Sequence, residues 1–298
     1  MPPPPEPPSV TIPASWPHGP LFDRMREALL AAPAYFKSEI RIVGVPSTDI
    51  QALGPILGAA IEQRVVDTLN GMRPVWDPSG EYALYSFVRQ PQTFPDVLLR
   101  RHGDGDVLMG VELKGWYLLA KEEEPSFRFT TTPKVCNPQD LMVVYPWHLS
   151  EVISGSPEII EPYIEHAKYI ALYRNWHWEH GRQATANPVV LSTAATPYPV
   201  KGDNISDKAT SDQGGNFGRI ARSGLMDNFK NGVNVRLLTG IPAKHWRAFL
   251  KIFTQSSTDA SVAAALKELE RQVRSDAAGN EKVVDEIFDR LRAIAAVL

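Results

Sequence analysis

Cysteine is almost absent from this 298-residue chain, in which Cys136 is the single example. One thiol excludes an intramolecular disulfide and any zinc site that is built from several cysteines. No histidine stands near Cys136 at a spacing typical of metal ligands. We therefore interpret Cys136 as a residue without a chemical role.

Long apolar runs are also missing. No stretch approaches the roughly 18 to 20 uncharged residues that a membrane-spanning helix requires. The N-terminal sequence MPPPPEPPSV lacks the charged and then apolar segments of a signal peptide. We therefore expect a cytoplasmic protein that has no membrane partner.

An overall excess of positive charge is the third absence. The chain has 31 lysines and arginines against 34 aspartates and glutamates, a formal net charge of −3. This balance excludes a polycation that coats nucleic acid indiscriminately. The charge is unevenly distributed, however, because residues 201–251 carry nine basic and four acidic residues, a local balance of +5. A local basic face therefore remains open.

Proline, in contrast, is concentrated at the start, where residues 1–20 hold nine of the 26 prolines. Proline restricts φ and removes an N–H donor, so we expect an extended arm. We predict three parts: residues 1–46, the proline-rich arm with a first helix; residues 47–255, the main body; and residues 256–298, a pair of amphipathic helices.

Apolar periodicity predicts further elements in the body. Residues 49–70 have apolar side chains every three or four positions and predict a helix that is capped by Ser47, Thr48 or Asp49. Residues 82–88 and 141–147 predict strands because they are rich in aromatic and β-branched side chains. The other predicted long element is a helix, rich in aromatic residues, over 158–181.

The segment TFPDVLLRRHGDGDVLMGVELKGW, residues 93–116, predicts a β-hairpin around its Gly/Asp-rich turn. Centring the turn pairs residues whose numbers sum to about 207 or 208, so Asp96 lies across from Val111 or Glu112. Because side chains alternate along a strand, Glu112 and Lys114 share one face. The hairpin therefore brings two carboxylates and a lysine together.

This combination of side chains suits phosphodiester hydrolysis. The reaction needs a hard cation, oxygen ligands to hold the cation, and a means of activating water near neutral pH. Asp96 and Glu112 can supply the ligands, and Lys114 can orient or deprotonate the water. The alternative is a surface hairpin in which Glu112 and Lys114 form an ion pair of little energetic value.

Pro95-Asp96 followed by Glu112-Leu113-Lys114 resembles the motif of the PD-(D/E)XK nuclease superfamily, which includes many type II restriction endonucleases. The resemblance implies that Asp96 and Glu112 bind Mg²⁺, that the Leu113 carbonyl adds a ligand, and that Lys114 assists the water. It also implies a further acidic residue on the preceding helix, for which Glu62 is the candidate.

The expected fold is therefore α/β (α+β), with a central mixed β-sheet flanked by helices. The resemblance covers the order helix, strand, hairpin, strand over residues 48–147, about a third of the chain. It departs from the superfamily between Lys114 and Leu141, where a helix is expected but the sequence EEEPSFRFTTTP predicts loop or strand.

The function implied is that of a Mg²⁺-dependent, sequence-specific endonuclease of double-stranded DNA, a type II restriction enzyme that leaves 5′-phosphate and 3′-hydroxyl ends. Cutting both strands of a symmetric site favours a homodimer, for which the helices within residues 256–298 could supply an interface. The setting would be the bacterial cytoplasm and its nucleoid. Two alternatives remain open: a structure-specific or repair nuclease on the same fold, and a non-catalytic DNA-binding protein.

DNA contacts are expected from an inserted recognition segment at about residues 200–255. Arg219 and Arg222 are one helical turn apart, next to Asn216, and could contact phosphates or guanine edges. Arg128 and Lys134 are further candidates for phosphate contacts. The alternative for Arg219 and Arg222 is a solvated helix face.

Overall fold

The computed structural model describes residues 5–90, 92–103, 105–182, 187–194, 196–212, 214–254, 256–276 and 281–295. Its α-helices are α1 (Gly19–Tyr35), α2 (Ser47–Ile50), α3 (Leu53–Gly71), α4 (Arg73–Trp76), α5 (Ala167–Trp176), α6 (Asp227–Val235), α7 (Ala243–Leu250), α8 (Asp259–Asp276) and α9 (Glu281–Ala295). The strands of the main sheet are β1 (Tyr85–Arg89), β2 (Val97–Arg101), β3 (Val107–Tyr117), β4 (Leu141–Leu149), β5 (Pro157–Ile159) and β6 (Tyr163–His166). Two small ribbons pair β7 (Val189–Val190) with β8 (Lys208–Ala209) and β9 (Leu237–Leu238) with β10 (Ile241–Pro242).

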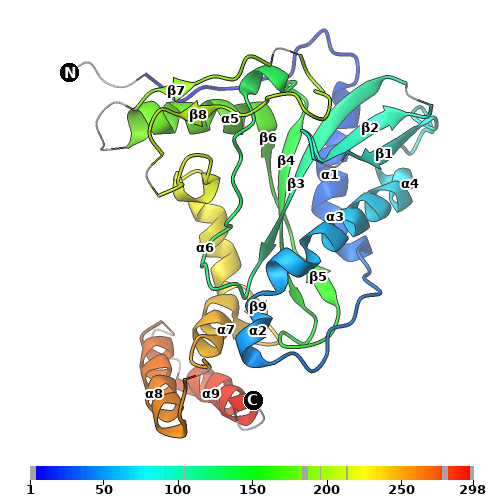
Figure 1. The fold of residues 1–298 in the computed structure, drawn as a ribbon. Helices are drawn as coiled ribbons and strands as arrows, with labels where there is room; N and C mark the ends of the chain where they lie inside the picture. Colours follow the sequence, from blue (N-terminus) through cyan, green and yellow to red (C-terminus); the bar gives the residue numbers. More distant parts are fainter. Residues whose placement is uncertain are drawn as a thin grey trace.

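The main sheet is mixed and has the order β1-β2-β3-β4-β5, with β6 beside another part of β4. Strands β1, β2 and β3 are antiparallel to one another, β3 and β4 are parallel, and β5 and β6 are antiparallel to β4. Helices α1, α3 and α4 lie to one side of this sheet, and α5 and α6 lie to the other (Figure 1). The expectation of a mixed sheet flanked by helices is therefore confirmed.

The hairpin of β2 and β3 forms as the sequence predicts. Val97 pairs with Val111 next to the predicted site, and the register shifts by one residue between Leu99 and Arg100, nearer the turn. The paired residue numbers therefore sum to 208 on one side of this β-bulge and to 207 on the other, which are the two predicted registers.

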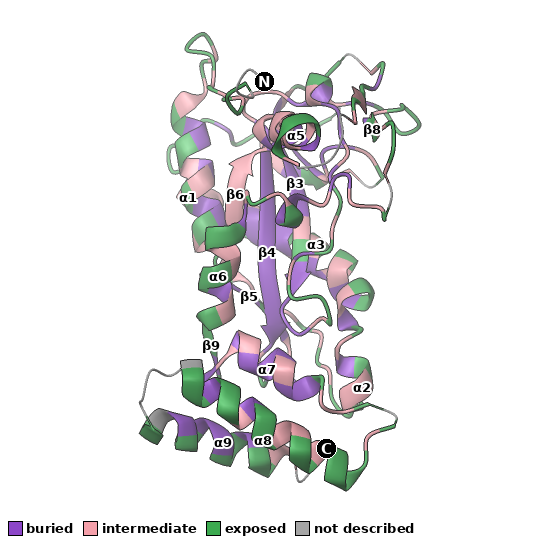
Figure 2. Cartoon of the chain, turned by 90° about the vertical axis from the view of Figure 1, so that its left-hand side faces the viewer, coloured by how far each residue is buried: buried purple, intermediate pink, exposed green. Residues whose placement is uncertain are grey.

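Strand β4 is the most completely buried element of the sheet, because every one of its nine residues is buried. It runs through the centre of the molecule and is coloured as buried along its length (Figure 2). Its near-continuous apolar sequence, LMVVYPWHL, is typical of a strand buried on both faces.

The connection from β3 to β4, residues 118–140, is described throughout and contains no α-helix, only a 3₁₀ turn at Pro133–Val135. Its backbone bonds instead to a distant segment: the N–H of Phe129 donates to the carbonyl of Gly218 at 2.8 Å, and that of Thr132 to Ile205 at 2.7 Å. These long-range bonds satisfy groups that a helix would satisfy locally.

The predicted helix over 158–181 was wrong in its first half. Residues there form β5 and β6, which pair with β4, and only α5 followed by a π-helical turn (His177–Gly181) is helical. Pro162 has no N–H to donate to a helix, and the surrounding isoleucines and tyrosine suit a pleated sheet.

The predicted helix over 49–70 was partly wrong. It is interrupted after α2, and Pro46 precedes α2, so Ser47, Thr48 and Asp49 do not cap it. The buried side chains of α3 include Leu53, Leu57, Ile61 and Val65, whereas Ile56 is 69% exposed.

The N-terminal arm packs against the body, since the indole Nε1 of Trp176 donates to the carbonyl of Pro5 at 2.7 Å. At the other end of the chain, α8 and α9 pack against each other next to α7 (Figure 1). The apolar stripe of α9 is buried within the chain, at Val284, Ile287, Phe288 and Leu291. Residues 1–4 of the predicted arm and 296–298 of the predicted last helix lie outside the described residues. Among the described helices, none is both long enough and apolar enough to cross a membrane.

Candidate active site

Asp96 lies directly before β2 and next to Pro95, whose ring lies close to Gly110 of β3. A side chain at Gly110 would overlap the ring of Pro95, so this close approach requires glycine at that position. The approach leaves the Asp96 backbone N–H 3.3 Å from Glu112 Oε2. The start of β2 is thereby held over the middle of β3.

The side chains of Asp96, Glu112 and Lys114 meet at this point. Lys114 Nζ lies 3.1 Å from Asp96 Oδ2 and 2.7 Å from Glu112 Oε1. The N–H of Leu113 also donates to Asp96 Oδ2, at 3.0 Å. The three predicted side chains therefore form one hydrogen-bonded cluster.

The cluster faces the side of the sheet on which α6 lies. Trp116, two residues beyond Lys114 and on the same face of β3, packs against Phe229 of α6. Tyr117, on the opposite face, lies against Gly54 of α3. The alternation of β3 thus separates the polar cluster from the core under α3.

Burial and mutual repulsion change the charge state of the cluster. Burial, supported by the negative charge of Asp96, raises the pKa of Glu112 to about 7 despite the opposing effect of Lys114. Burial lowers the pKa of Lys114, but the two carboxylates outweigh it and raise that pKa above its ordinary value. Lys114 is therefore a protonated ammonium group that bridges two carboxylates, one of which titrates near neutral pH.

Glu62 lies on α3 and does not hydrogen-bond to the three residues. Its Oε2 is 3.1 Å from Arg89 Nη2, at the end of β1. Burial raises the pKa of Glu62, and Asp96 raises it further, whereas Lys114 and Arg89 lower it. Glu62 therefore lies within the electrostatic range of the cluster but is paired to an arginine.

The donor set suits a hard divalent cation. Asp96 and Glu112 offer carboxylate oxygens, and the two side chains already share one cation, the Lys114 ammonium. Within the described part of the chain, no three or more His, Cys, Asp or Glu side chains are grouped as metal ligands. A Mg²⁺ ion here would therefore take two carboxylates and complete its coordination with water and a backbone carbonyl such as that of Leu113.

Asp140, which no pattern in the sequence singled out, is fully buried just before β4. Its carboxylate accepts hydrogen bonds from the N–H of Gly110 and of Asn137, both at 2.7 Å, and from Tyr198 Oη at 3.0 Å. Burial raises the pKa of Asp140 to about 7. The position of this aspartate, directly before a long apolar strand, could have indicated a buried carboxylate. Its partner Tyr198 could not be identified from the sequence, because it is 58 residues away.

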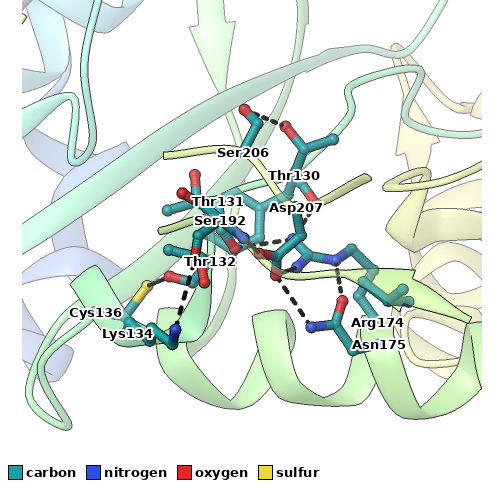
Figure 3. Close-up of polar contacts among 12 residues, drawn as sticks. Thr130, Thr131, Thr132, Lys134, Cys136, Arg174, Asn175, Ser192, Ser206 and Asp207 are labelled. Atoms are coloured by element: carbon teal, nitrogen blue, oxygen red, sulfur yellow. Dashed lines mark hydrogen bonds and ion pairs between the residues drawn. The ribbon is translucent and has the colours of Figure 1, made fainter. Parts of the chain in front are cut away.

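A buried ion pair that the sequence did not indicate joins Arg174 of α5 to Asp207, directly before β8 (Figure 3). Arg174 Nη2 lies 2.6 Å from Asp207 Oδ2, and Arg174 Nη1 donates to the carbonyls of Phe129 and Thr131. The backbone N–H of Ser192 donates to the other oxygen of Asp207 at 2.8 Å. This cluster joins segments that are distant in sequence.

The structure brings three of the five predicted DNA contacts together. Asn216, Arg219 and Arg222 line one cavity of about 310 Å³. Arg128 lies nearby, where its side chain is 2.5 Å from Asp212 and donates to the carbonyl of Phe217. Lys134 lies apart, on the 3₁₀ turn, and donates to the carbonyl of Ser192 (Figure 3).

Cys136 is buried, and two histidines near α5 pack against aromatic rings. Burial raises the pKa of the Cys136 thiol well above its ordinary value, so it stays protonated. The ring of His166 stacks on Phe22, and that of His177 stacks on Tyr173.

Comparison with known proteins finds neither a family model nor a curated relative that matches this sequence.

Proposed function

We propose that this protein is a Mg²⁺-dependent endonuclease that hydrolyses phosphodiester bonds of double-stranded DNA at specific sequences. The observation that carries the proposal is the convergence of Asp96, Glu112 and Lys114 within hydrogen-bonding distance on the start of β2 and the middle of β3. Two carboxylates can hold a hard cation that activates water for phosphodiester hydrolysis, and a lysine beside them can orient that water.

Each residue has a distinct role in this proposal. Asp96, Glu112 and the Leu113 carbonyl would hold Mg²⁺, and Glu62 would support the site through its negative charge. When bound, Mg²⁺ would supply a Lewis acid for the phosphate and lower the pKa of water. Lys114 has three N–H donors, of which two contact the carboxylates, so the third can orient a water molecule.

The arrangement of elements supports a core like that of the PD-(D/E)XK nucleases. Helix α3, the antiparallel strands β1 to β3 and the parallel strand β4 follow the order helix, strand, hairpin, strand. The β3–β4 connection departs from this pattern because it lacks an α-helix.

Charge and position support DNA as the partner. Residues 201–251 are basic, and Arg222 lies just before α6, the helix that packs on Trp116 beside the cluster. Asn216, Arg219 and Arg222 could therefore hold the DNA backbone on the side of the sheet that the cluster faces. Arg128 and Lys134 would make weaker contacts.

Cleavage of both strands of a symmetric site would need two copies of the chain. The apolar stripe of α9 is used within the chain, so a homodimer would have to use other faces of α8 and α9 or another surface. This assembly would act on DNA in the cytoplasm.

The test is incubation of the purified protein with large, unmethylated DNA in Mg²⁺ and in EDTA, with Lys114→Ala protein in parallel. We expect discrete fragments with 5′-phosphate ends only for the wild-type protein in Mg²⁺. If intact duplex is not cut, the same proteins are tested on flaps, junctions and damaged duplexes. Cutting of those substrates alone would replace the proposal with a structure-specific nuclease, and no cutting with measurable DNA binding would leave a binding protein.

A further inference from the structure

The cavity next to α5 has an unusual lining. Its walls come from the end of α5, the π-helical turn and the segment around the 3₁₀ turn Ile220–Arg222. The polar side chains that line it are Arg174, His177, Arg182, Asn216, Arg219, Arg222 and Ser223. No carboxylate lines this cavity among the described residues, so its charge is wholly positive.

The positive charges of two of the four arginines are compensated by carboxylates that do not line the cavity. Arg174 is paired with Asp207 at 2.6 Å, and Arg222 Nε is 2.5 Å from Glu124 Oε1. Arg182 and Arg219 have no carboxylate partner within the part of the chain that the structure describes; Arg219 donates only to the carbonyls of Gly215 and Ser126, at 3.3 and 3.4 Å. The cavity therefore holds about two uncompensated positive charges.

The cavity wall is held in a specific shape. Arg182 lies over the ring of Trp178, with its Cζ 3.8 Å from the ring centre, and Phe217 packs edge-on against the same ring. Trp178 is buried, and its Nε1 has no hydrogen-bond partner among the described residues. Both Trp178 and His177 lie on the π-helical turn, a geometry that is frequent at functional sites.

We propose that this cavity binds a phosphate group other than the one that is cleaved. Guanidinium groups converging from several segments match the several oxygens of a phosphate, with which arginine forms two parallel hydrogen bonds. A cavity of about 310 Å³ has room for a phosphate together with an attached sugar or base. The phosphate can come from the DNA backbone, which rests on the proposed function, or from a free nucleotide, which does not.

The test measures binding without cleavage, in EDTA. Calorimetry measures the affinity for inorganic phosphate and for deoxyadenosine monophosphate, and gel shift measures the affinity for a DNA duplex of about 12 base pairs. Wild-type protein is compared with Arg182→Gln and Arg219→Gln, whose side chains are partly exposed, and with Arg271→Gln, a matched loss of charge on the exposed surface of α8. Thermal melting checks that each variant is folded.

We expect Arg182→Gln and Arg219→Gln each to weaken phosphate or nucleotide binding about tenfold, whereas Arg271→Gln leaves it unchanged. Duplex binding that weakens in parallel, with a salt dependence reduced by about one phosphate contact, identifies the DNA backbone as the source. Weakening of the small ligands alone identifies a free nucleotide. Affinities for every probe that are unaffected by both cavity variants would overturn the proposal. Lys114 does not line this cavity, so Lys114→Ala protein should bind inorganic phosphate and deoxyadenosine monophosphate with wild-type affinity, and loss of cleavage in that variant tests the nuclease separately.

Discussion

Two clusters in this molecule hold a cation against carboxylate oxygens: one consists of Arg174 and Asp207, and the other of Asp96, Glu112 and Lys114. They differ in how completely their polar atoms are hydrogen-bonded and buried. Both oxygens of Asp207 accept hydrogen bonds, and both residues are almost fully buried. In the other cluster, the side chains of Asp96 and Lys114 are 24% and 19% exposed.

The charge states differ in the same way. Arg174 stays charged across the physiological range, because burial lowers its pKa only to about 10. Glu112 has a pKa near 7 and can gain or lose its proton under ordinary conditions. The comparison indicates that the cluster of Arg174 and Asp207 holds distant segments together. The cluster of Asp96, Glu112 and Lys114, called the accessible cluster below, is instead suited to changing its charge and its ligands.

The largest expected effect is on catalysis. Lys114→Ala should lower the rate of DNA cleavage in Mg²⁺ by about 10²- to 10⁴-fold, because the ammonium group that contacts both carboxylates would no longer orient the water. Lys121→Ala, on the exposed loop after β3, is the matched control and should cut at the wild-type rate. A Lys114→Ala protein that cuts as fast as the control would remove the lysine from the mechanism.

The next effect is on stability. Arg174→Met should lower the free energy of unfolding by about 3–5 kcal/mol, because it leaves the Asp207 carboxylate buried without its cation. Urea denaturation measures this change, and Arg271→Met, at an exposed position of α8, should stay within about 0.5 kcal/mol of wild type. A loss below about 1 kcal/mol for Arg174→Met would contradict the role of this pair in holding distant segments together.

Glu112 of the one cluster and Asp140, which lies outside both clusters, should make stability depend on pH, whereas Arg174 should not. The pKa values of Glu112 and Asp140 rise from 4.5 and 3.8 to about 7 on folding. Between pH 5 and 7 the folded chain therefore binds more protons than the unfolded chain, and these groups make stability fall as pH rises. Glu112→Gln and Asp140→Asn should each flatten this slope in urea titrations, while Arg174→Met should not, because its group does not titrate in the window.

Gly110→Ala tests how the accessible cluster is positioned. The new methyl group would overlap the Pro95 ring, so we expect a loss of about 1–3 kcal/mol and displacement of Asp96 from Glu112. Gly58→Ala, in α3 where nothing lies near the added carbon, is the control and should be neutral or stabilising. Equal stability and activity of the two variants would show that the contact with Pro95 does not position Asp96.

The smallest effect is that of the metal on the intact protein. Mg²⁺ at about ten times its Kd should stabilise the folded state by about 1.4 kcal/mol. The rise in Tm should be larger at pH 8 than at pH 6, because the proton on Glu112 competes with the ion. Asp96→Asn should abolish the rise, and an equal rise at both pH values or in this variant would place Mg²⁺ elsewhere.

The accessible cluster was predictable because its geometry is local. Asp96 and Glu112 lie on two strands of one hairpin, and the turn sets which residues pair. Strand alternation then places Lys114 beside Glu112. Glu62 was harder to place, because its relation to the cluster depends on how α3 packs against the sheet, and its pairing with Arg89 could not be read from spacing.

The sequence by itself determined the elements with strong local signals: the hairpin and its register, the central apolar strand, and the helices α3, α8 and α9. The tertiary structure decided whether residues 158–166 became helix or strand, since the backbone of these residues pairs with β4 and does not form helical hydrogen bonds. It also decided that Arg174 pairs with Asp207, 33 residues away, and that Asp140 accepts from Tyr198, 58 residues away. Such contacts depend on which segments fold against each other. The periodicity of apolar residues along the chain does not indicate which residues far apart in sequence become close in space.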